Sequence, residues 1–156
     1  MSDKKVPEEE LLITERLLLR PPLLEDAKIF SLYNTREEFY RYLPIDPPTL
    51  ESTENYISHQ ISQSKADPRL GYYFIITDRK TNEVLGDICL NIKDLDARVA
   101  ITGFGLNPRY WGKGYMSEAL GKIIEMGFNQ LKLKRIYGIC DPDNKGSVKV
   151  LENCGM

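Results

Sequence analysis

Apolar and polar residues follow two different spacings along the chain, and the change from one to the other outlines its organisation. A leucine-rich run over 11–20 ends at a pair of prolines and is typical of a strand. Helical spacing follows over 24–34 and again over about 50–65, on either side of a proline-imposed loop at 44–48. The expected inner face of the second helix consists of Leu50, Tyr56, Ile57 and Ile61.

From residue 71 onward the pattern changes, because aromatic and β-branched residues dominate short runs that are separated by turn residues. The elements that this pattern predicts are, in order, strands over 72–77, 84–92 and 99–106, a helix over 115–131, a strand over 135–140 and a helix from Asn144 to Gly155. Three consecutive strands predict an antiparallel meander. With helices before it and a strand–helix tail after it, the chain is expected to have an α+β fold with a mixed sheet.

Composition narrows the class of protein. At 156 residues the chain suits one domain, and 21 lysines plus arginines against 23 aspartates plus glutamates give a net charge of −2. This balance gives no electrostatic footprint for nucleic acid. No apolar run reaches the length that spans a bilayer, so no membrane partner is expected.

Metal-binding chemistry is not expected either. Cys89, Cys140 and Cys154 form no C-x-x-C pair, and His59 is the only histidine, in a polar stretch that is typical of a solvated surface. An odd number of scattered thiols fits a reducing compartment, so the expected location is cytoplasmic.

The junction after the third strand carries the clearest candidate chemistry. The first turn of the helix that follows offers unpaired N–H groups and a partial positive charge, which suit an anion. Gly112 and Gly114 let the backbone approach a ligand and adopt positive φ, while Arg109 and Lys113 add charge. These residues predict a pyrophosphate site. The alternative is a tight turn whose glycines serve only geometry; neither a Walker motif nor G-x-G-x-x-G occurs here.

The same loop matches R/Q-x-x-G-x-G/A, the signature of the GNAT N-acetyltransferases, and the chain resembles in particular the RimJ/RimL branch of ribosomal-protein N-terminal acetyltransferases. Segments that resemble this branch lie, in order, at 12–21, 24–27, 107–120, 141–147 and 150–155. The resemblance covers nearly the whole chain. It implies one GNAT domain over 1–156, with a mostly antiparallel sheet flanked by about four helices, and acetyl-CoA as co-substrate.

The resemblance also implies roles for particular residues. The backbone of residues 104–106 would pair with the pantetheine arm, the N–H groups of residues 111–115 would bind the pyrophosphate, and Asn144 would bind the thioester region. The implied cofactor-binding residues are Phe104, Gly105, Leu106, Arg109, Trp111, Gly112, Lys113, Gly114, Tyr115, Asn144 and Ser147.

Ser147 is the candidate acid that protonates the departing thiolate. A competing structural interpretation makes Asn144 an ordinary helix N-cap and Ser147 a first-turn residue. The base is less clear, because the glutamate of the branch's fourth strand aligns with Ile101, and the tyrosine acid of other branches aligns with Leu151. Asp87 in the neighbouring strand is a weak candidate for the base, since carboxylates on strands are more often surface residues.

The acceptor is the least defined part. The resemblance implies transfer to a primary amine, with a protein N-terminus as the first expectation and a small amine or antibiotic as the alternative. The family's final hairpin follows the G-F pattern, and the chain reaches only Met156 there. Either a truncated chain or a partner that supplies the missing strands is therefore expected. An exposed edge strand would favour a homodimer, and a truncated chain has the alternative of being a CoA-binding module without activity.

Overall fold

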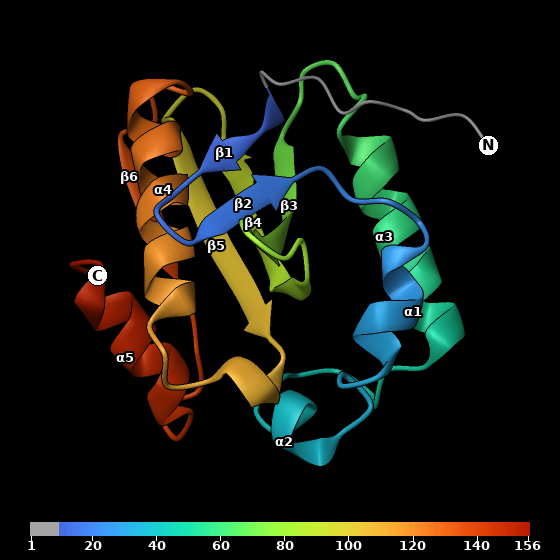
Figure 1. Ribbon diagram of the computed structural model, residues 1–156. Coiled ribbons are helices and arrows are strands. Elements are labelled where there is room, and N and C mark those ends of the chain that lie inside the picture. The colour runs from blue at the N-terminus through green and yellow to red at the C-terminus, as the bar shows by residue number, and fades with distance from the viewer. Residues whose placement is uncertain (1–9) are drawn as a thin grey trace.

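Residues 10–156 are described by the computed structural model (Figure 1). Their centre is a six-stranded sheet in the order β1-β2-β3-β4-β5-β6, antiparallel throughout except for the parallel pair β5–β6. The strands are β1 (Leu12–Ile13), β2 (Leu17–Arg20), β3 (Gly71–Asp78), β4 (Val84–Asp94), β5 (Val99–Leu106) and β6 (Arg135–Gly138). The mixed sheet confirms the expected fold class.

Helices cover both faces of the sheet, with α4 and α5 on one side and α1 and α3 on the other (Figure 1). The five α-helices of residues 10–156 are α1 (Asp26–Ser31), α2 (Glu37–Tyr40), α3 (Leu50–Gln63), α4 (Tyr115–Asn129) and α5 (Lys145–Asn153). None of these helices has the length and apolar character needed to cross a membrane.

The side chains of β4 point alternately to the two faces of the sheet, and this alternation explains why the two faces differ. Ile88 and Leu90 point toward α4 and are fully buried there, as period-2 side chains on one strand must share a face. Asp87 and Cys89 therefore point to the opposite face, under α1 and α3. The apolar stripe of α4 packs on the first face through Met116, Ala119, Leu120, Ile123 and Met126.

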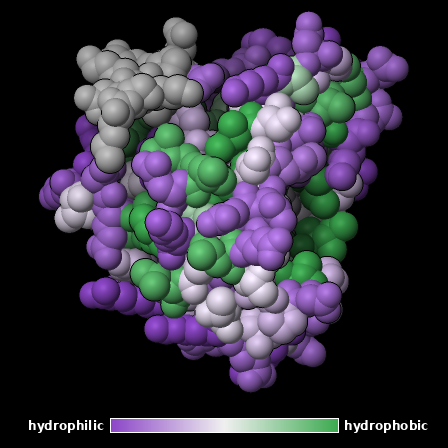
Figure 2. Space-filling model, turned by 90° about the vertical axis from the view of Figure 1, so that its right-hand side faces the viewer, coloured by the Kyte–Doolittle hydropathy of each residue, from purple (hydrophilic) through white to green (hydrophobic). Residues whose placement is uncertain are grey.

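The core on the second face is smaller. It is formed by Ala27, Phe30 and Tyr33 from the α1 region, Ile57 from α3, and Tyr73, Ile75 and Val84 from the sheet. A bidentate ion pair holds α1 against β2, because Arg20 donates at 2.9 and 2.7 Å to the two carboxylate oxygens of buried Asp26. The outer surface on this side mixes hydrophilic and hydrophobic side chains (Figure 2), with Leu24, Ile29 and Leu32 exposed.

Several sequence expectations need correction. The run over 11–20 is two strands, β1 and β2, because the chain reverses at residues 14–16 and the two pieces pair with each other. The helix expected over 24–34 ends at Ser31, and α2 was not expected. Leu50 is exposed, and Thr53 is buried beside Ile57 in its place.

Candidate active site

The loop between β5 and α4 has the backbone that its glycines predict. Gly112 has φ +75° and Gly114, the residue before α4, has φ +79°, both in the left-handed region. A Cβ built on Gly112 would meet no atom within 4 Å, so open space adjoins the backbone here. A loop of this shape leads into the first-turn N–H groups of α4, which is the donor arrangement that a phosphate needs.

The loop is fastened to the turn between β1 and β2. The Arg16 guanidinium donates to the Lys113 carbonyl oxygen at 3.0 Å and to Glu118 at 2.8 Å, and it lies 4.3 Å from the centre of the Tyr115 ring. Thr14 also donates to Glu118. Partial burial raises the pKa of Glu118, but the hydrogen bonds from Thr14 and Arg16 outweigh it and lower that pKa overall.

The end of β5 has a free edge. Parallel pairing between β5 and β6 runs only from Val99 with Arg135 to Thr102 with Gly138. Residues 103–106 pair with β4 on one side and have no strand partner among the described residues on the other. The Trp111 indole N–H donates to the Leu106 carbonyl oxygen at 2.9 Å, so half-exposed Trp111 folds back onto the strand. The free edge holds the segment expected to pair with pantetheine.

At the start of α5, Asn144 is the helix N-cap. Its side chain accepts a hydrogen bond from the Ser147 backbone N–H at 3.2 Å and caps the helix. Leu151 packs against Gly138 of β6: a Cβ at Gly138 would come within 2.7 Å of its side chain. Neither Asn144 nor Ser147 lines the pocket described next.

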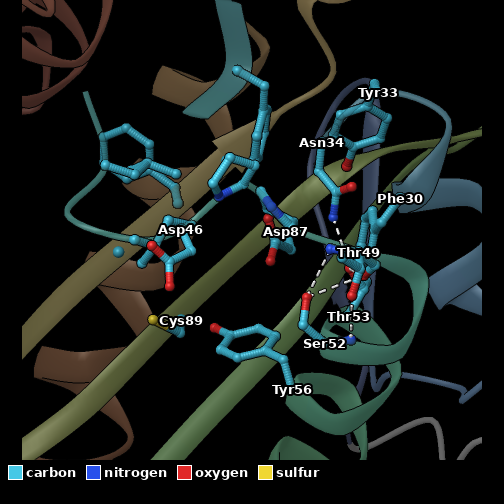
Figure 3. A pocket seen from close by; sticks show the side chains of 18 of the residues that line it. Phe30, Tyr33, Asn34, Asp46, Thr49, Ser52, Thr53, Tyr56, Asp87 and Cys89 are labelled. Atoms are coloured by element: carbon cyan, nitrogen blue, oxygen red, sulfur yellow. Dashed lines mark hydrogen bonds between the residues drawn. The ribbon is translucent and has the colours of Figure 1, made fainter. Parts of the chain in front are cut away.

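A pocket of about 690 Å³ lies on the other face of the sheet (Figure 3). Its walls come from the α1–α2 region, the proline-rich loop, the start of α3 and the three central strands. The lining residues are Phe30, Tyr33, Asn34, Phe39, Leu43, Ile45, Asp46, Pro47, Pro48, Thr49, Ser52, Thr53, Tyr56, Tyr73, Asp87, Cys89, Gly103, Phe104 and Gly105. A volume of this size suits a small-molecule ligand.

Two glycines make the hollow. Gly103 lies opposite Cys89 and Gly105 opposite Asp87 in the β4–β5 register, on the face toward the pocket. A Cβ at Gly105 would stand 3.0 Å from the Phe39 ring and 3.1 Å from an Asp87 carboxylate oxygen. Side chains at these positions would fill the floor of the pocket, so the glycines keep Asp87 accessible from the free edge of β5.

Asp87 is the ionisable group at the base of this pocket. The Tyr73 hydroxyl donates to it at 2.7 Å. Burial dominates and raises the pKa of Asp87 to about 6, although that hydrogen bond and those from the Asp87 and Gly105 backbone lower it in part. Burial, with the Asp87 charge as the second cause, also raises the pKa of Tyr73 and of Tyr33. A carboxylate with a pKa near neutrality is suited to exchange protons with an amine.

The sequence missed most of this pocket. No motif marks Tyr73, Asn34 or Asp46, and a carboxylate on a strand, such as Asp87, is usually exposed. The signal that could have identified Asp87 is the register of two adjacent strands, which sets it beside Gly105. His59 is exposed, as expected. Among residues 10–156 no cluster of His, Cys, Asp and Glu side chains could hold a metal ion.

Known proteins resemble the chain over most of its length. It is 35% identical over 144 residues to the uncharacterized N-acetyltransferase p20 of Bacillus licheniformis, a match that covers 92% of this chain and 80% of that protein. A GNAT-family acetyltransferase from Bacillus anthracis has the same fold, with a TM-score of 0.79 at 29% identity, over 94% of this chain and 82% of the other.

The fold also occurs in the microcin C7 self-immunity acetyltransferase MccE, whose structure contains acetyl-CoA and AMP. The TM-score is 0.77 at 21% identity, over 91% of this chain and 79% of that one, which shows the fold alone. The family model for the acetyltransferase (GNAT) domain matches residues 16–156. The chain therefore belongs to the GNAT acetyltransferases, enzymes that use acetyl-CoA as co-substrate.

Proposed function

We propose that the chain, as a single domain, transfers the acetyl group of acetyl-CoA to a primary amine by direct attack in a ternary complex, with Asp87 as the general base. The observation that carries this proposal is the position of Asp87. Its carboxylate stands at the base of an apolar pocket, beside Gly105 on the free edge of β5. An amine in the pocket and a thioester along that edge would meet at this point.

On the cofactor side, the glycine loop and the first turn of α4 would hold the pyrophosphate, with Arg109 and Lys113 adding positive charge. The backbone of residues 103–106 would pair with the pantetheine arm, and its N–H groups would stabilise the developing oxyanion. Asn144 would bind the thioester region through its side-chain NH₂, because its carbonyl oxygen already caps α5.

The proton balance of the proposed reaction is simple. An ammonium ion enters the pocket and gives one proton to the Asp87 carboxylate. The neutral nitrogen then attacks the thioester carbon, so that a C–N bond forms and the C–S bond breaks. The departing thiolate takes a proton from the Ser147 hydroxyl. After the attack the nitrogen loses its second proton, and this proton restores the Ser147 hydroxyl. The products are an acetamide, the free thiol of CoA and one proton, which Asp87 returns to solvent.

The acceptor in this proposal is a primary amine; the RimJ/RimL resemblance favours a protein N-terminus, whereas the pocket of about 690 Å³ favours a small amine. The cytosol is the proposed location, in keeping with the free thiols of Cys89, Cys140 and Cys154. The outer edge of β6 supports a homodimer formed by strand pairing. Light scattering after size-exclusion chromatography would contradict a dimer if it gave the mass of one chain.

Thermal shift and thiol release together test the proposed function. Acetyl-CoA and CoA should raise the melting temperature, while ATP and NAD should leave it nearly unchanged, because the loop lacks the motifs of nucleotide-binding folds. Thiol release from acetyl-CoA should then depend on an added amine. Equal shifts with all four ligands would refute the cofactor site. A shift without amine-dependent thiol release would leave a binding module and refute the enzyme.

A further inference from the structure

The lining of the pocket around Asp87 has an unusual balance of charge. It contains two carboxylates, Asp46 at the rim and Asp87 at the base, and no lysine, arginine or histidine among the described residues. Figure 3 shows both carboxylates facing the same space as the Tyr56 ring. A pocket with two acids and no base attracts cations and repels a ligand that carries its own carboxylate.

Aromatic rings form a large part of the remaining wall. Phe30, Tyr33 and Phe39 pack edge to face, with ring centres 5.8 and 5.3 Å apart, and Tyr56 meets Tyr73 in the same way at 5.7 Å. Ring faces and edges of this kind bind apolar groups, and they attract an ammonium ion through their quadrupoles. The wall therefore suits a ligand with a hydrophobic body and a positive end.

Several hydrogen-bond donors of the wall are already used. Thr49 and Ser52 bond each other in the capping box of α3. The Asn34 NH₂ donates to Thr53 at 2.9 Å, and the Thr53 hydroxyl donates to a backbone carbonyl. The Tyr73 hydroxyl donates to Asp87. The neutral hydroxyls of Tyr33 and Tyr56 also line the pocket, but no charged donor does, so a ligand carboxylate finds no opposite charge there.

Acceptors, by contrast, remain available. The Asn34 carbonyl oxygen has no hydrogen-bond partner among the described residues, but it is itself buried, so the acceptors open to a ligand are the two carboxylates. Asp46 is exposed at the rim and Asp87 can accept further bonds, as each carboxylate has several lone pairs. A ligand that brings N–H donors without acceptors complements this set.

Together these features assign a substrate class, and the assignment rests on the proposed function. We propose that the acceptor is a compact primary amine with an aromatic or branched apolar body and no carboxylate beside its amino group. Asp46 at the rim then discriminates between acceptors by charge, because its carboxylate attracts cations and repels acids. Asp87 takes the proton deeper in. An arylalkylamine has this chemistry; a free amino acid lacks it, and a polyamine lacks the apolar body.

Matched acceptor pairs test the assignment with the intact chain and acetyl-CoA. Phenethylamine and L-phenylalanine differ by one carboxylate, as do tryptamine and L-tryptophan. The value of kcat/KM should be about 100-fold higher for each amine than for its acid. Spermidine and a short peptide with a free N-terminus should be poorer acceptors than phenethylamine. A peptide, polyamine or amino acid that outperforms both arylalkylamines would overturn the assignment and leave the proposed acetyltransfer intact.

A charge reversal at Asp46 gives a second readout. Asp46→Lys should shrink the preference for phenethylamine over phenylalanine by about 10-fold, through KM more than kcat. The matched control is Asp96→Lys, an equal charge change on the exposed β4–β5 turn at the far end of the strands, and it should leave the preference unchanged. An equal change in both variants would refute a role for Asp46. Acetyl-CoA binding without transfer to any of these acceptors would refute the proposed function itself.

Discussion

The proposed cofactor loop over 109–115 and the proposed acceptor pocket around Asp87 adjoin the same end of β5, yet they are assembled in opposite ways. The loop is one continuous segment whose properties follow from backbone N–H groups, a helix start and two glycines with positive φ. The pocket gathers residues from eight separate elements or loops. Local sequence can specify the first almost completely. The second depends on which strands become neighbours and which helices cover them.

This difference makes the two regions separable by mutation. Changes in the loop should affect acetyl-CoA binding, and changes in the pocket should affect the acceptor step. A variant that lowers acetyl-CoA affinity and the rate of the acceptor step equally would show that the two regions do not have separate functions.

Gly112→Glu should have the largest effect. A carboxylate at this position would face the pyrophosphate, and acetyl-CoA affinity should fall on the order of 100-fold or more. Isothermal titration measures it. Gly112→Ala is the matched control, because its Cβ would meet no atom within 4 Å. Backbone strain at positive φ should lower the stability of this variant by about 1 kcal/mol. Normal binding by a folded Gly112→Glu protein would show that the loop is not the cofactor site.

Asp87→Asn should come next, with a fall in kcat/KM on the order of 100-fold and little change in acetyl-CoA affinity. The pKa of Asp87 is about 6, so activity of the parent chain should rise with pH through this value as the carboxylate forms. The variant should lack this limb of the pH profile. A variant that keeps the limb would exclude Asp87 as the base.

Ser147→Ala should lower kcat by about 10-fold and leave acetyl-CoA affinity unchanged, because the hydroxyl is needed only when the thiolate departs. The alanine keeps the backbone N–H that bonds Asn144, so α5 should begin as before. Circular dichroism checks this point. An unchanged kcat would remove Ser147 as the acid and leave it an ordinary first-turn residue.

The smallest expected effect concerns stability. Folding raises the pKa of Asp87 from its usual 3.8 to about 6, so the folded state binds this proton more tightly. The stability that the group contributes is full below about pH 4 and is lost as pH rises through about 6. At pH 8 Asp87→Asn should therefore raise the free energy of unfolding by about 1–2 kcal/mol. Urea unfolding should show no such gain at pH 4; equal gains at both pH values would contradict the charge explanation.

The sequence predicted the elements whose pattern is local. β3, β4, β5 and α4 lie within a few residues of their expected positions. The family and the fold class followed from an ordered set of such segments.

The acceptor half could not be predicted in the same way. Tyr73 lies 14 residues before Asp87 in the chain, and its hydroxyl reaches that carboxylate only because β3 pairs with β4. Asn34 reaches Thr53 across 19 residues through the packing of α1 on α3. No spacing rule joins such residues. The split of 11–20 into two strands has a local cause, a turn in which the Leu17 N–H donates to the Thr14 hydroxyl at 3.0 Å, but no glycine, proline or asparagine marks that turn.

The contacts of Arg16 have a thermodynamic consequence for the N-terminal hairpin. They join the turn between β1 and β2 to the Lys113 carbonyl and to Glu118, so the order of the hairpin and the order of the loop are coupled. Such coupling is reciprocal: a ligand that fixes the loop stabilises the hairpin by the same free energy that the hairpin lends to binding. The amides of β1 and β2 thus become remote reporters of cofactor occupancy, through slower hydrogen exchange.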